Sequence, residues 1–294
     1  MANSPRKTAR SQSLYDRLSR LTYEDACKLL GAAGKRLLSE GGKLEIDAPA
    51  QVELTPTVFR LRLPGLNGDE AVVTIQVDKE RRQGLAVQCR GGRNPGVARG
   101  AALAFILEEK QYLGLASMPN QDQPFELLDD PELEEWALRE RVKRAETEPM
   151  DIKALDSSTP WTDYVVTSRL SGKTYRVALR GMGRGDSYCN CADFRANTLG
   201  ACKHVIKVQG AVRKKFSARR LRDAYIHEGF AVAVSYVKKP CLRLLTPDSE
   251  SGLSTRSISR LAGRDLESSK DIHSLLKFLA EAQQNQVEVR IYPD

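Results

Sequence analysis

The segment Tyr188-Cys-Asn-Cys-Ala-Asp-Phe-Arg-Ala-Asn-Thr-Leu-Gly-Ala-Cys-Lys-His204 gathers the residues of this chain that best suit a metal ion. Within it lie three of the six cysteines of the chain and one of its three histidines, namely Cys189, Cys191, Cys202 and His204. Thiolate and imidazole groups are preferred zinc ligands, and four of them complete a closed tetrahedral site. The segment therefore predicts one zinc ion held by three cysteines and one histidine.

The spacing of these four residues also predicts the local backbone. Residues i and i+2 of a strand point to the same side, so Cys-x-Cys suits the end of a strand. Cys-x-His suits the first turn of a helix, where backbone N–H groups lack intrahelical partners and stabilise thiolate charge. The opposing interpretation, reduced cysteines that cluster by chance, does not account for this strand–loop–helix context. We therefore expect zinc to hold a strand, a loop and a helix start together.

No fifth group in the sequence argues for catalysis at this zinc. A zinc deaminase carries His-x-Glu and Pro-Cys-x-x-Cys, and a metalloprotease carries His-Glu-x-x-His, and the chain contains none of these patterns. Four protein ligands also leave no coordination position open for a reactive water. The expected role of the zinc is therefore structural.

The order of parts over residues 175–209 resembles the SWIM-type zinc finger. A strand and a turn lead into Tyr188-Cys-Asn-Cys-Ala-Asp-Phe194, and Cys202-Lys-His204 opens an apolar helix. The wider phrasing, with Asp163-Tyr-Val-Val and Ser171-Gly-Lys-Thr-Tyr-Arg, is similar to the finger that precedes bacterial SWI/SNF-type helicase-like ATPases. The resemblance implies a zinc-dependent module for contact with nucleic acid or protein.

Positive charge is concentrated around the same cluster. The segment Val166–Arg222 holds fourteen lysines and arginines and two acids, a formal charge of +12 in a chain whose total is +8, so the rest carries −4. Such an excess is typical of a surface for DNA or RNA, with phosphate contacts dominating. The alternative is a solvated face that only favours solubility. The expected contacts are Arg176, Arg180, Lys203, Lys207, Arg213, Lys214, Lys215, Arg219, Arg220 and Arg222.

The whole chain predicts an α+β protein of several parts. Its 294 residues, 41% hydrophobic and 29% charged, suffice for a real core and for two or three domains. We expect an N-terminal α+β domain at 1–117, an acidic linker and helix at 118–160, the zinc finger domain at 161–222 and a C-terminal α+β extension at 223–294. The expected order is N-terminal helices with a β-β-α block, the ββα finger, and a hairpin, helix and strand.

Hydrophobic periodicity and turn residues place the elements within these parts. The N-terminal part predicts a helix at 13–40 that Gly41-Gly42 ends, strands at 44–46, 58–63, 72–77 and 85–89, and a helix at 96–115. A linker is expected at 117–130. The charged helix at 130–147 is expected to be exposed or docked by Trp136 alone. Strands at 164–167 and 174–179, an approach to the cysteines at 187–191 and a helix at 202–212 follow. The C-terminal part predicts strands at 231–236 and 241–245, a helix that Asp271 caps and a strand at 287–292.

The block at 71–115 repeats the order of the finger without its ligands. Two strands, the loop Gly91-Gly-Arg-Asn-Pro-Gly96 and an apolar helix follow one another as in the finger. Cys89 occupies a ligand-like place, whereas Val87 stands where the paired cysteine would be and Ala98-Arg-Gly100 stands where Cys-x-His would be. The block is either a repeat that has lost its metal ligands and is held by apolar packing, or an ordinary β-β-α unit, and both interpretations stay open.

Several function classes are excluded by what the sequence lacks. No apolar run approaches the roughly 18 residues that a membrane span needs, and no apolar stretch follows the basic N-terminus as in a signal peptide. Clustered cysteines then indicate metal binding in a reducing compartment, so we expect a cytoplasmic protein. Gly31-Ala-Ala-Gly-Lys-Arg36 lacks the spacing of a phosphate loop and lies inside an expected helix. No other ATPase, nucleophile or kinase motif appears, so we expect neither catalysis nor a small-molecule substrate.

Two functions remain open from the sequence. The first is a zinc finger module that binds DNA or RNA as the accessory region of, or companion to, a SWI/SNF-type helicase-like ATPase. The second is a protein-interaction adaptor, in which zinc stabilises a surface for an acidic partner, or for the chain's own acidic segment near Asp129–Glu135, without direct contact to nucleic acid. The basic face near the zinc is the expected binding surface in both.

Overall fold

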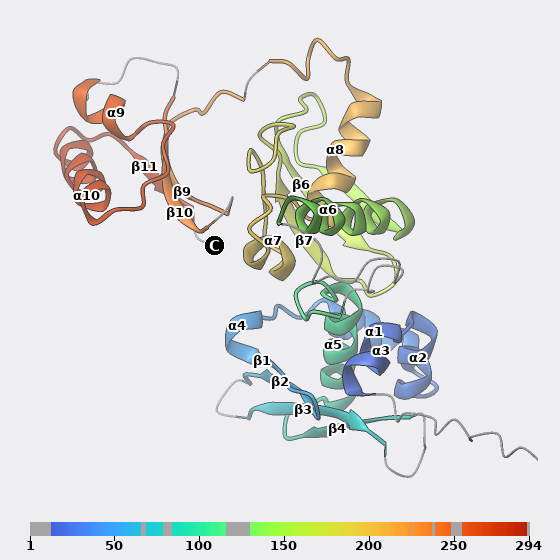
Figure 1. Ribbon diagram of the computed structural model, residues 1–294. Coiled ribbons are helices and arrows are strands. Elements are labelled where there is room, and N and C mark those ends of the chain that lie inside the picture. Colours follow the sequence, from blue (N-terminus) through green and yellow to red (C-terminus); the bar gives the residue numbers. More distant parts are fainter. Residues whose placement is uncertain are drawn as a thin grey trace, which may run out of the picture. The chain divides into compact units, whose positions relative to one another are not determined.

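A computed structural model gives the fold and describes residues 13–65, 69–78, 84–115, 130–223, 225–236, 239–247 and 255–292 (Figure 1). Helices and sheets alternate along these residues, which confirms the predicted α+β class. The linker predicted at 117–130 lies almost wholly outside the described residues. The chain divides into two compact units: the first comprises Met1–Pro124, Pro149–Asp151 and Thr167–Thr174, and the second comprises Phe125–Glu148, Ile152–Val166 and Tyr175–Asp294.

The first unit begins with three short helices where the sequence predicts one. They are α1 (Leu14–Arg20), α2 (Tyr23–Leu30) and α3 (Gly34–Gly42). A new helix begins after Thr22 because its hydroxyl accepts a hydrogen bond from the Asp25 N–H in a capping box. Gly31 then adopts a left-handed φ of 78°, which ends α2. The segment 31–36 therefore spans a break between two helices, and its expected place inside one helix is wrong.

Four antiparallel strands follow in sequential order. They are β1 (Val52–Leu54), β2 (Phe59–Leu63), β3 (Ala71–Val77) and β4 (Leu85–Arg90), preceded by α4 (Ala48–Gln51). The three strands predicted between 58 and 89 are confirmed. The strand predicted at 44–46 is wrong, because these residues run without regular structure into α4, where Pro49 has no N–H for a sheet ladder.

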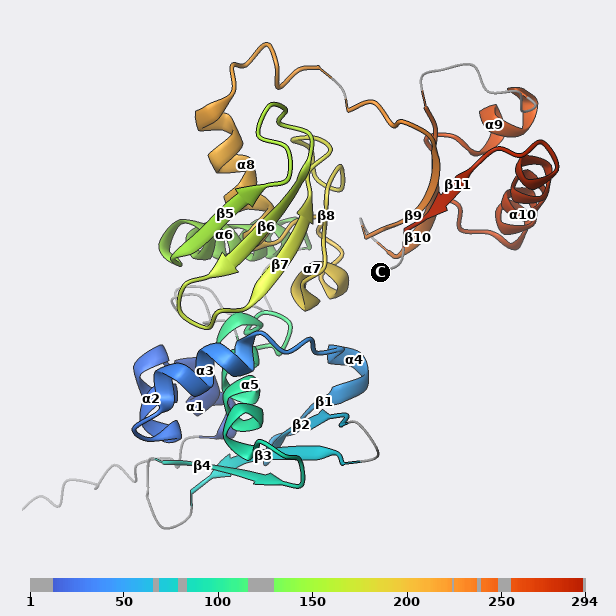
Figure 2. The ribbon, with the colours of Figure 1, turned by 180° about the vertical axis from the view of Figure 1, so that it is seen from behind.

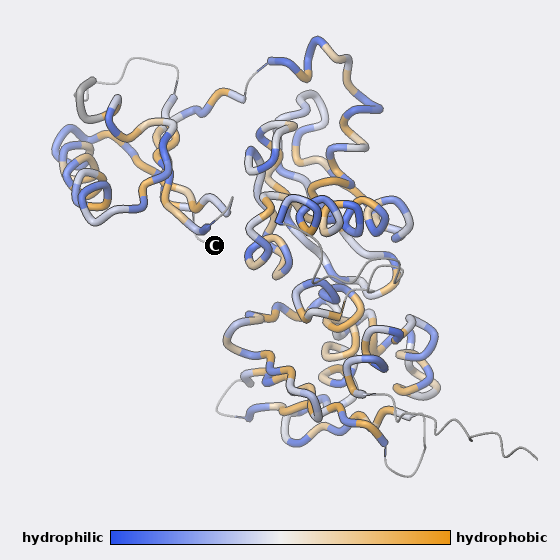
Figure 3. Tube along the Cα trace, in the orientation of Figure 1, coloured by the Kyte–Doolittle hydropathy of each residue, from blue (hydrophilic) through white to orange (hydrophobic). Residues whose placement is uncertain are grey.

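Helix α5 (Pro95–Glu108) packs on this sheet and against α3. Its trace in Figure 3 is mostly hydrophobic, and nine of its fourteen residues are buried. Two glycines let the helices approach closely. A β-carbon on Gly100 would lie 2.0 Å from the Leu37 carbonyl oxygen, and one on Gly41 would lie 2.2 Å from the Ala101 nitrogen. The helix ends at Glu108 and a turn follows, whereas the sequence predicts helix to 115.

A second four-stranded sheet carries the predicted metal ligands. Its strands, hydrogen-bonded in this order, are β5 (Met150–Ala154), β6 (Asp163–Ser168), β7 (Thr174–Ala178) and β8 (Tyr188–Cys189), and Figure 2 shows them side by side. The strands predicted at 164–167 and 174–179 are confirmed. Strand β5 is not foreseen by the sequence, and it lies in the segment assigned there to a linker and a helix.

Three helices accompany this sheet: α6 (Asp130–Thr147), α7 (Ala192–Ala196) and α8 (Lys203–Lys215). Helix α6 has the predicted bounds, and its trace is mostly hydrophilic (Figure 3). It is nevertheless not docked by Trp136 alone. It packs along α8 and buries Arg141 and Ala145. The physical reason is a buried ion pair, which a count of apolar residues cannot show.

A three-stranded sheet and two helices complete the second unit. They are β9 (Phe230–Ser235), β10 (Cys241–Leu245), α9 (Thr255–Leu261), α10 (Ser269–Gln284) and β11 (Val289–Ile291), with sheet order β10-β9-β11. The predicted hairpin is confirmed, and β11 pairs parallel to β9. Helix α10 begins before Asp271, because Ser268 is the N-cap and Asp271 is its capping-box partner. Helix α9 is not foreseen by the sequence.

Candidate metal centre

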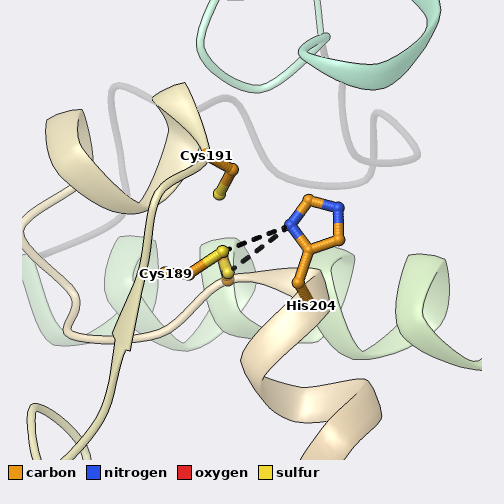
Figure 4. Close-up of side chains that lie close together, drawn as sticks. Cys189, Cys191 and His204 are labelled. Atoms are coloured by element: carbon orange, nitrogen blue, oxygen red, sulfur yellow. Dashed lines mark hydrogen bonds between the residues drawn. The ribbon is translucent and has the colours of Figure 1, made fainter. Parts of the chain in front are cut away.

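The four predicted ligands meet in one buried cluster, with Cys189, Cys191 and His204 pointing toward one another (Figure 4). Cys189 ends β8, Cys191 precedes α7, and Cys202 and His204 lie at the start of α8. One ligand atom from each residue lies within 4.8 Å of the other three, and none of the four residues is more than 2% exposed. The cluster is thus able to hold one zinc ion.

Distances within the cluster match a tetrahedral zinc site. Nδ1 of His204 lies 3.7 Å from Sγ of Cys189 and 3.9 Å from Sγ of Cys202. With zinc–sulfur bonds of about 2.3 Å and zinc–nitrogen bonds of about 2.0–2.1 Å, tetrahedral geometry separates sulfur from nitrogen by about 3.6 Å. The observed separations are only slightly larger, so a zinc ion fits between these ligands after small side-chain shifts.

Helix starts and a stacked ring position the ligand atoms. Cys191 is the N-cap of α7, and its sulfur accepts a hydrogen bond of 3.3 Å from the Phe194 N–H. Cys202 is the N-cap of α8, so its side chain lies at the positive end of that helix. Tyr175 of β7 stacks on the His204 ring, with 3.9 Å between centroids and 28° between planes. These contacts orient the side chains of Cys191, Cys202 and His204.

The protonation of the thiols shows what a cation would contribute. Burial raises the pKa of Cys189 well above its usual range and raises the pKa of Cys191 to about 11. Burial also disfavours ionisation of Cys202, but hydrogen bonds from the Cys189 and Cys191 thiols outweigh it and lower the pKa of Cys202 to about 5. Ligation requires all three thiols to ionise, and the charge of a divalent cation would offset the burial that disfavours their ionisation.

Helix α6 holds the ligand loop through a buried ion pair. Arg141 donates from Nε to Oδ2 of Asp193 at 3.0 Å and from Nη2 to Oδ1 at 2.5 Å. Both side chains are 8% exposed. Asp193 belongs to α7 and follows the ligand Cys191 closely in the chain. Because a bidentate arginine–carboxylate pair fixes orientation as well as distance, Arg141 positions the loop between β8 and α8.

The residue that follows α6 also holds the start of α8. Lys203 stands between the ligands Cys202 and His204, is buried, and donates from Nζ to Oε2 of Glu148 at 2.6 Å. Nζ of Lys207 donates to the Glu148 carbonyl at 3.3 Å. The sequence assigns Lys203 to nucleic-acid contact. This assignment is corrected, because the ammonium group is buried against Glu148 and supports the metal cluster instead.

The other predicted contacts fall into two groups. Arg176 is exposed and Arg180 is half-buried, and both donate to the carboxylate of Asp163, at 2.8 and 2.5 Å. The second group lies at the end of α8 and just beyond it, and all of its members are exposed. We call it the α8 basic surface, and it consists of Arg213, Lys214, Lys215, Arg219, Arg220 and Arg222.

A second group of possible ligands lies in the C-terminal sheet. Cys241, Asp265 and Glu267 have ligand atoms within 4.8 Å of one another, but both acids are exposed. Arg243 pairs with Asp265, and Lys239 pairs with Glu267 at 2.6 Å. Because the carboxylates already have cationic partners, we assign no metal to this group. Cys241 is buried, as expected for a core residue.

Sequence reasoning missed the residues that support the metal cluster. Arg141 and Glu148 lie in a charged segment, and charged side chains in such segments are usually solvated. One signal was present: Arg141, Ala145 and Glu148 recur at spacings that place them on one face of a helix. That pattern favours a docked helix even though its members are not all apolar.

Comparison with known proteins finds no relative of this chain. No protein-family model matches it, and neither the curated proteins nor the solved structures contain a match. The likeness to the SWIM-type finger therefore rests on the residues of the chain alone. Among the residues that the structure describes, a helix able to cross a lipid bilayer is absent.

Proposed function

We propose that this chain is a zinc-stabilised module that binds DNA or RNA through the α8 basic surface. The observation that carries the proposal is the layout of α8. The helix begins with two of the four candidate ligands and ends with Arg213, Lys214 and Lys215. Zinc in the cluster would join the start of α8 to β8 and would thereby hold the charged end of the helix in a fixed place on the module.

The role we propose for the zinc ion is structural. Cys189, Cys191, Cys202 and His204 would hold it, and its contribution would be a cross-link between a strand, a short helix and a long helix. Four protein ligands fill a tetrahedral shell, so the ion would have no position for substrate or reactive water. We accordingly propose that the chain itself is not an enzyme.

Binding to nucleic acid would depend chiefly on phosphate contacts. The stretch 213–222 carries six cations and no acid. Phe216 stands among them, with Nζ of Lys215 5.2 Å and the guanidinium carbon of Arg220 5.5 Å from the centre of its ring. Each duplex phosphate that is neutralised contributes about −0.9 to the slope of log affinity against log salt concentration. Weak sequence preference and a steep salt dependence are therefore expected.

The partner that we propose for the module is a SWI/SNF-type helicase-like ATPase. The support is the likeness of residues 163–209 to the finger that precedes such ATPases. In this arrangement the module would bind nucleic acid and the ATPase would supply the motor, whether the two are parts of one protein or separate chains.

A second candidate function is a protein-interaction adaptor. The observation that favours it is the ion pair between Lys203 and the Glu148 carboxylate, because it shows that a cation of α8 already meets an acidic group of protein. An acidic partner protein would then use the α8 basic surface in place of phosphates. Salt would weaken both kinds of complex, so salt dependence alone does not separate them.

Reversing Arg213, Lys214 and Lys215 to Glu tests the proposed function. These residues are exposed and lie beyond the ligands on the same helix, so zinc content should stay at the wild-type level. We expect the affinity for duplex DNA, single-stranded DNA or RNA to fall about 100-fold at low salt, because three phosphate contacts turn repulsive. Fluorescence anisotropy with each labelled nucleic acid measures this change.

The matched control reverses Arg264, Lys270 and Lys277, which are exposed cations of the C-terminal part. It changes the net charge by the same amount at a distant place in the sequence. A loss of nucleic-acid affinity confined to the α8 variant supports the proposal. Heparin serves as a competing polyanion that is not a nucleic acid. Unchanged nucleic-acid affinity in the α8 variant would remove the proposal and favour the adaptor.

A further inference from the structure

The second unit contains a cavity that none of the four candidate zinc ligands lines. Its volume is about 340 Å³, at the small end of the range for small-molecule sites. Residues of β7, β8, β9 and β10 line it, together with residues between β7 and β8, the segment before β9, and Tyr292. Seven of the lining residues carry the argument: Arg176, Arg180, Tyr188, Tyr225, His227, Ser235 and Arg243. A space of this size suits a single small ligand and excludes a nucleic-acid duplex.

One wall of the cavity consists of planar groups. The guanidinium carbon of Arg180 lies 4.6 Å from the centre of the Tyr225 ring. Tyr225 meets His227 edge to face, with 4.7 Å between centroids and 89° between planes. Tyr188 also lines the cavity, and its ring lies 6.2 Å from that of Tyr236. Aromatic and guanidinium planes stack well on the flat ring of a nucleobase, whatever its sequence identity.

Guanidinium groups give the cavity the means to bind an anion. Arg176 and Arg180 both line it and share the single carboxylate of Asp163, so two positive charges face one negative charge. Arg243 also lines it and pairs with Asp265. Each guanidinium has five N–H donors in one plane, and these carboxylates use only some of them. Donors therefore remain for a phosphate group.

One polar atom of the wall has only a weak partner in the protein. The Oγ atom of Ser235 is buried, has no oxygen or nitrogen partner among the described residues, and interacts with the Cys241 thiol. Because a thiol is a weak hydrogen-bonding group, an oxygen of a bound molecule would be a better partner for this hydroxyl. Asp186 also lines the cavity, where its carboxylate accepts a hydrogen bond of 2.7 Å from the Gly183 N–H and its charge acts on Arg243.

We infer that this cavity binds a mononucleotide, with the base against the planar wall and the phosphate at the arginines. A nucleotide combines a flat aromatic ring, an anion and hydroxyl groups, and the cavity offers a matching group for each. A free nucleotide and the terminal nucleotide of a single strand present the same chemistry. The site uses no residue of the α8 basic surface, so it goes beyond the proposed function and stands or falls separately from it.

Calorimetric titration of the full chain tests the inference with four probes. They are adenosine 5′-monophosphate, adenosine, inorganic phosphate and a 5′-phosphorylated single-stranded oligonucleotide. We expect the nucleotide to bind at least about tenfold more tightly than adenosine or phosphate, because the planar wall and the arginines then both contribute to binding. If the oligonucleotide displaces the nucleotide, the occupant is the end of a strand; if it does not, the occupant is a free nucleotide.

Two variants place the binding in this cavity. Tyr225→Ala removes a stacking plane and Arg243→Gln removes a phosphate donor, and each should weaken nucleotide binding about tenfold or more. Arg264→Gln, an exposed arginine outside the cavity, is the control and should change nothing. Thermal melting of each variant confirms that it folds. Absence of nucleotide binding at millimolar concentration, equal binding of phosphate alone, or full binding by both folded cavity variants would overturn the inference.

Discussion

The link from β4 to α5 and the link from β8 to α8 each lead from a four-stranded sheet into a helix, but different interactions hold the two helices in place. Each follows a four-stranded sheet in sequential order and leads into a helix. Cys89 pairs with Val73 in the first sheet as Cys189 pairs with Val177 in the second. The second link then brings three further ligands together, whereas Gly100 of the first lies in contact with the Leu37 backbone.

Burial explains why one link needs no metal. Helix α5 buries nine of its fourteen residues, while α8 buries five of thirteen, and two of those five are Lys203 and His204. A helix with little apolar burial gains little from packing, so the free energy that holds it must come from elsewhere. The block at 71–115 is thus held by apolar packing, and both interpretations, a metal-free repeat and an ordinary β-β-α unit, stay open.

Removal of zinc should separate the two links most strongly. Structural zinc contributes about 10–16 kcal/mol of apparent binding free energy in small finger peptides. We expect a chelator to abolish hydrogen-exchange protection in α7 and α8 and to leave α5 and the strands it covers protected. Mass spectrometry of exchanged peptides measures both links in one sample. Equal loss of protection in both would show one cooperative unit and would break the comparison.

Arg141→Ala should weaken the second link without touching a ligand. It removes the bidentate arginine from the buried Asp193 carboxylate, and breaking a buried ion pair in this way costs about 3–5 kcal/mol. We expect faster transfer of zinc to a chromophoric chelator and a lower melting temperature. Arg139→Ala is the control on the same helix, because Arg139 is exposed and lies 3.9 Å from Glu135. Identical zinc release from the two variants would mean that α6 does not position the ligand loop.

Gly100→Ala should weaken the first link by crowding. Its β-carbon would lie 2.0 Å from the Leu37 carbonyl oxygen, and overpacking of this kind costs about 1–3 kcal/mol. The matched variant Gly210→Ala, on α8, places its β-carbon in open space and should be neutral or stabilising by up to about 1 kcal/mol. Urea unfolding measures both. If Gly100→Ala is as harmless as Gly210→Ala, close packing on α3 does not hold α5.

Features with local causes were predictable from the sequence. The four ligands have distinctive chemistry and short spacing, so their meeting place follows from a few residues. The Thr22 and Asp25 pair marks a helix start, and the strands of both sheets alternate apolar and polar residues. The break between α2 and α3 has a local cause too, because Gly31 adopts a left-handed φ, yet the apolar spacing across residues 13–40 predicts one helix.

Features that depend on distant partners were not predictable. Strand β5 is recognisable only once β6 pairs with it, because its own alternation covers just five residues. The burial of Arg141 and Lys203 depends on acids 52 and 55 residues away in the chain, respectively. Net charge over a segment therefore overestimates the free basic surface, since part of that charge is neutralised inside the fold.

The stoichiometry of zinc tests the central claim most directly. Protein purified without oxygen should contain one zinc per chain by elemental analysis, and Cys202→Ser should lose it, because a buried ligand is missing. Cys89→Ser should keep all of it, because residues 71–115 contain no other cysteine and no histidine that could join Cys89 as a ligand. Absence of zinc, full retention in Cys202→Ser, or loss of a second equivalent in Cys89→Ser would contradict this account.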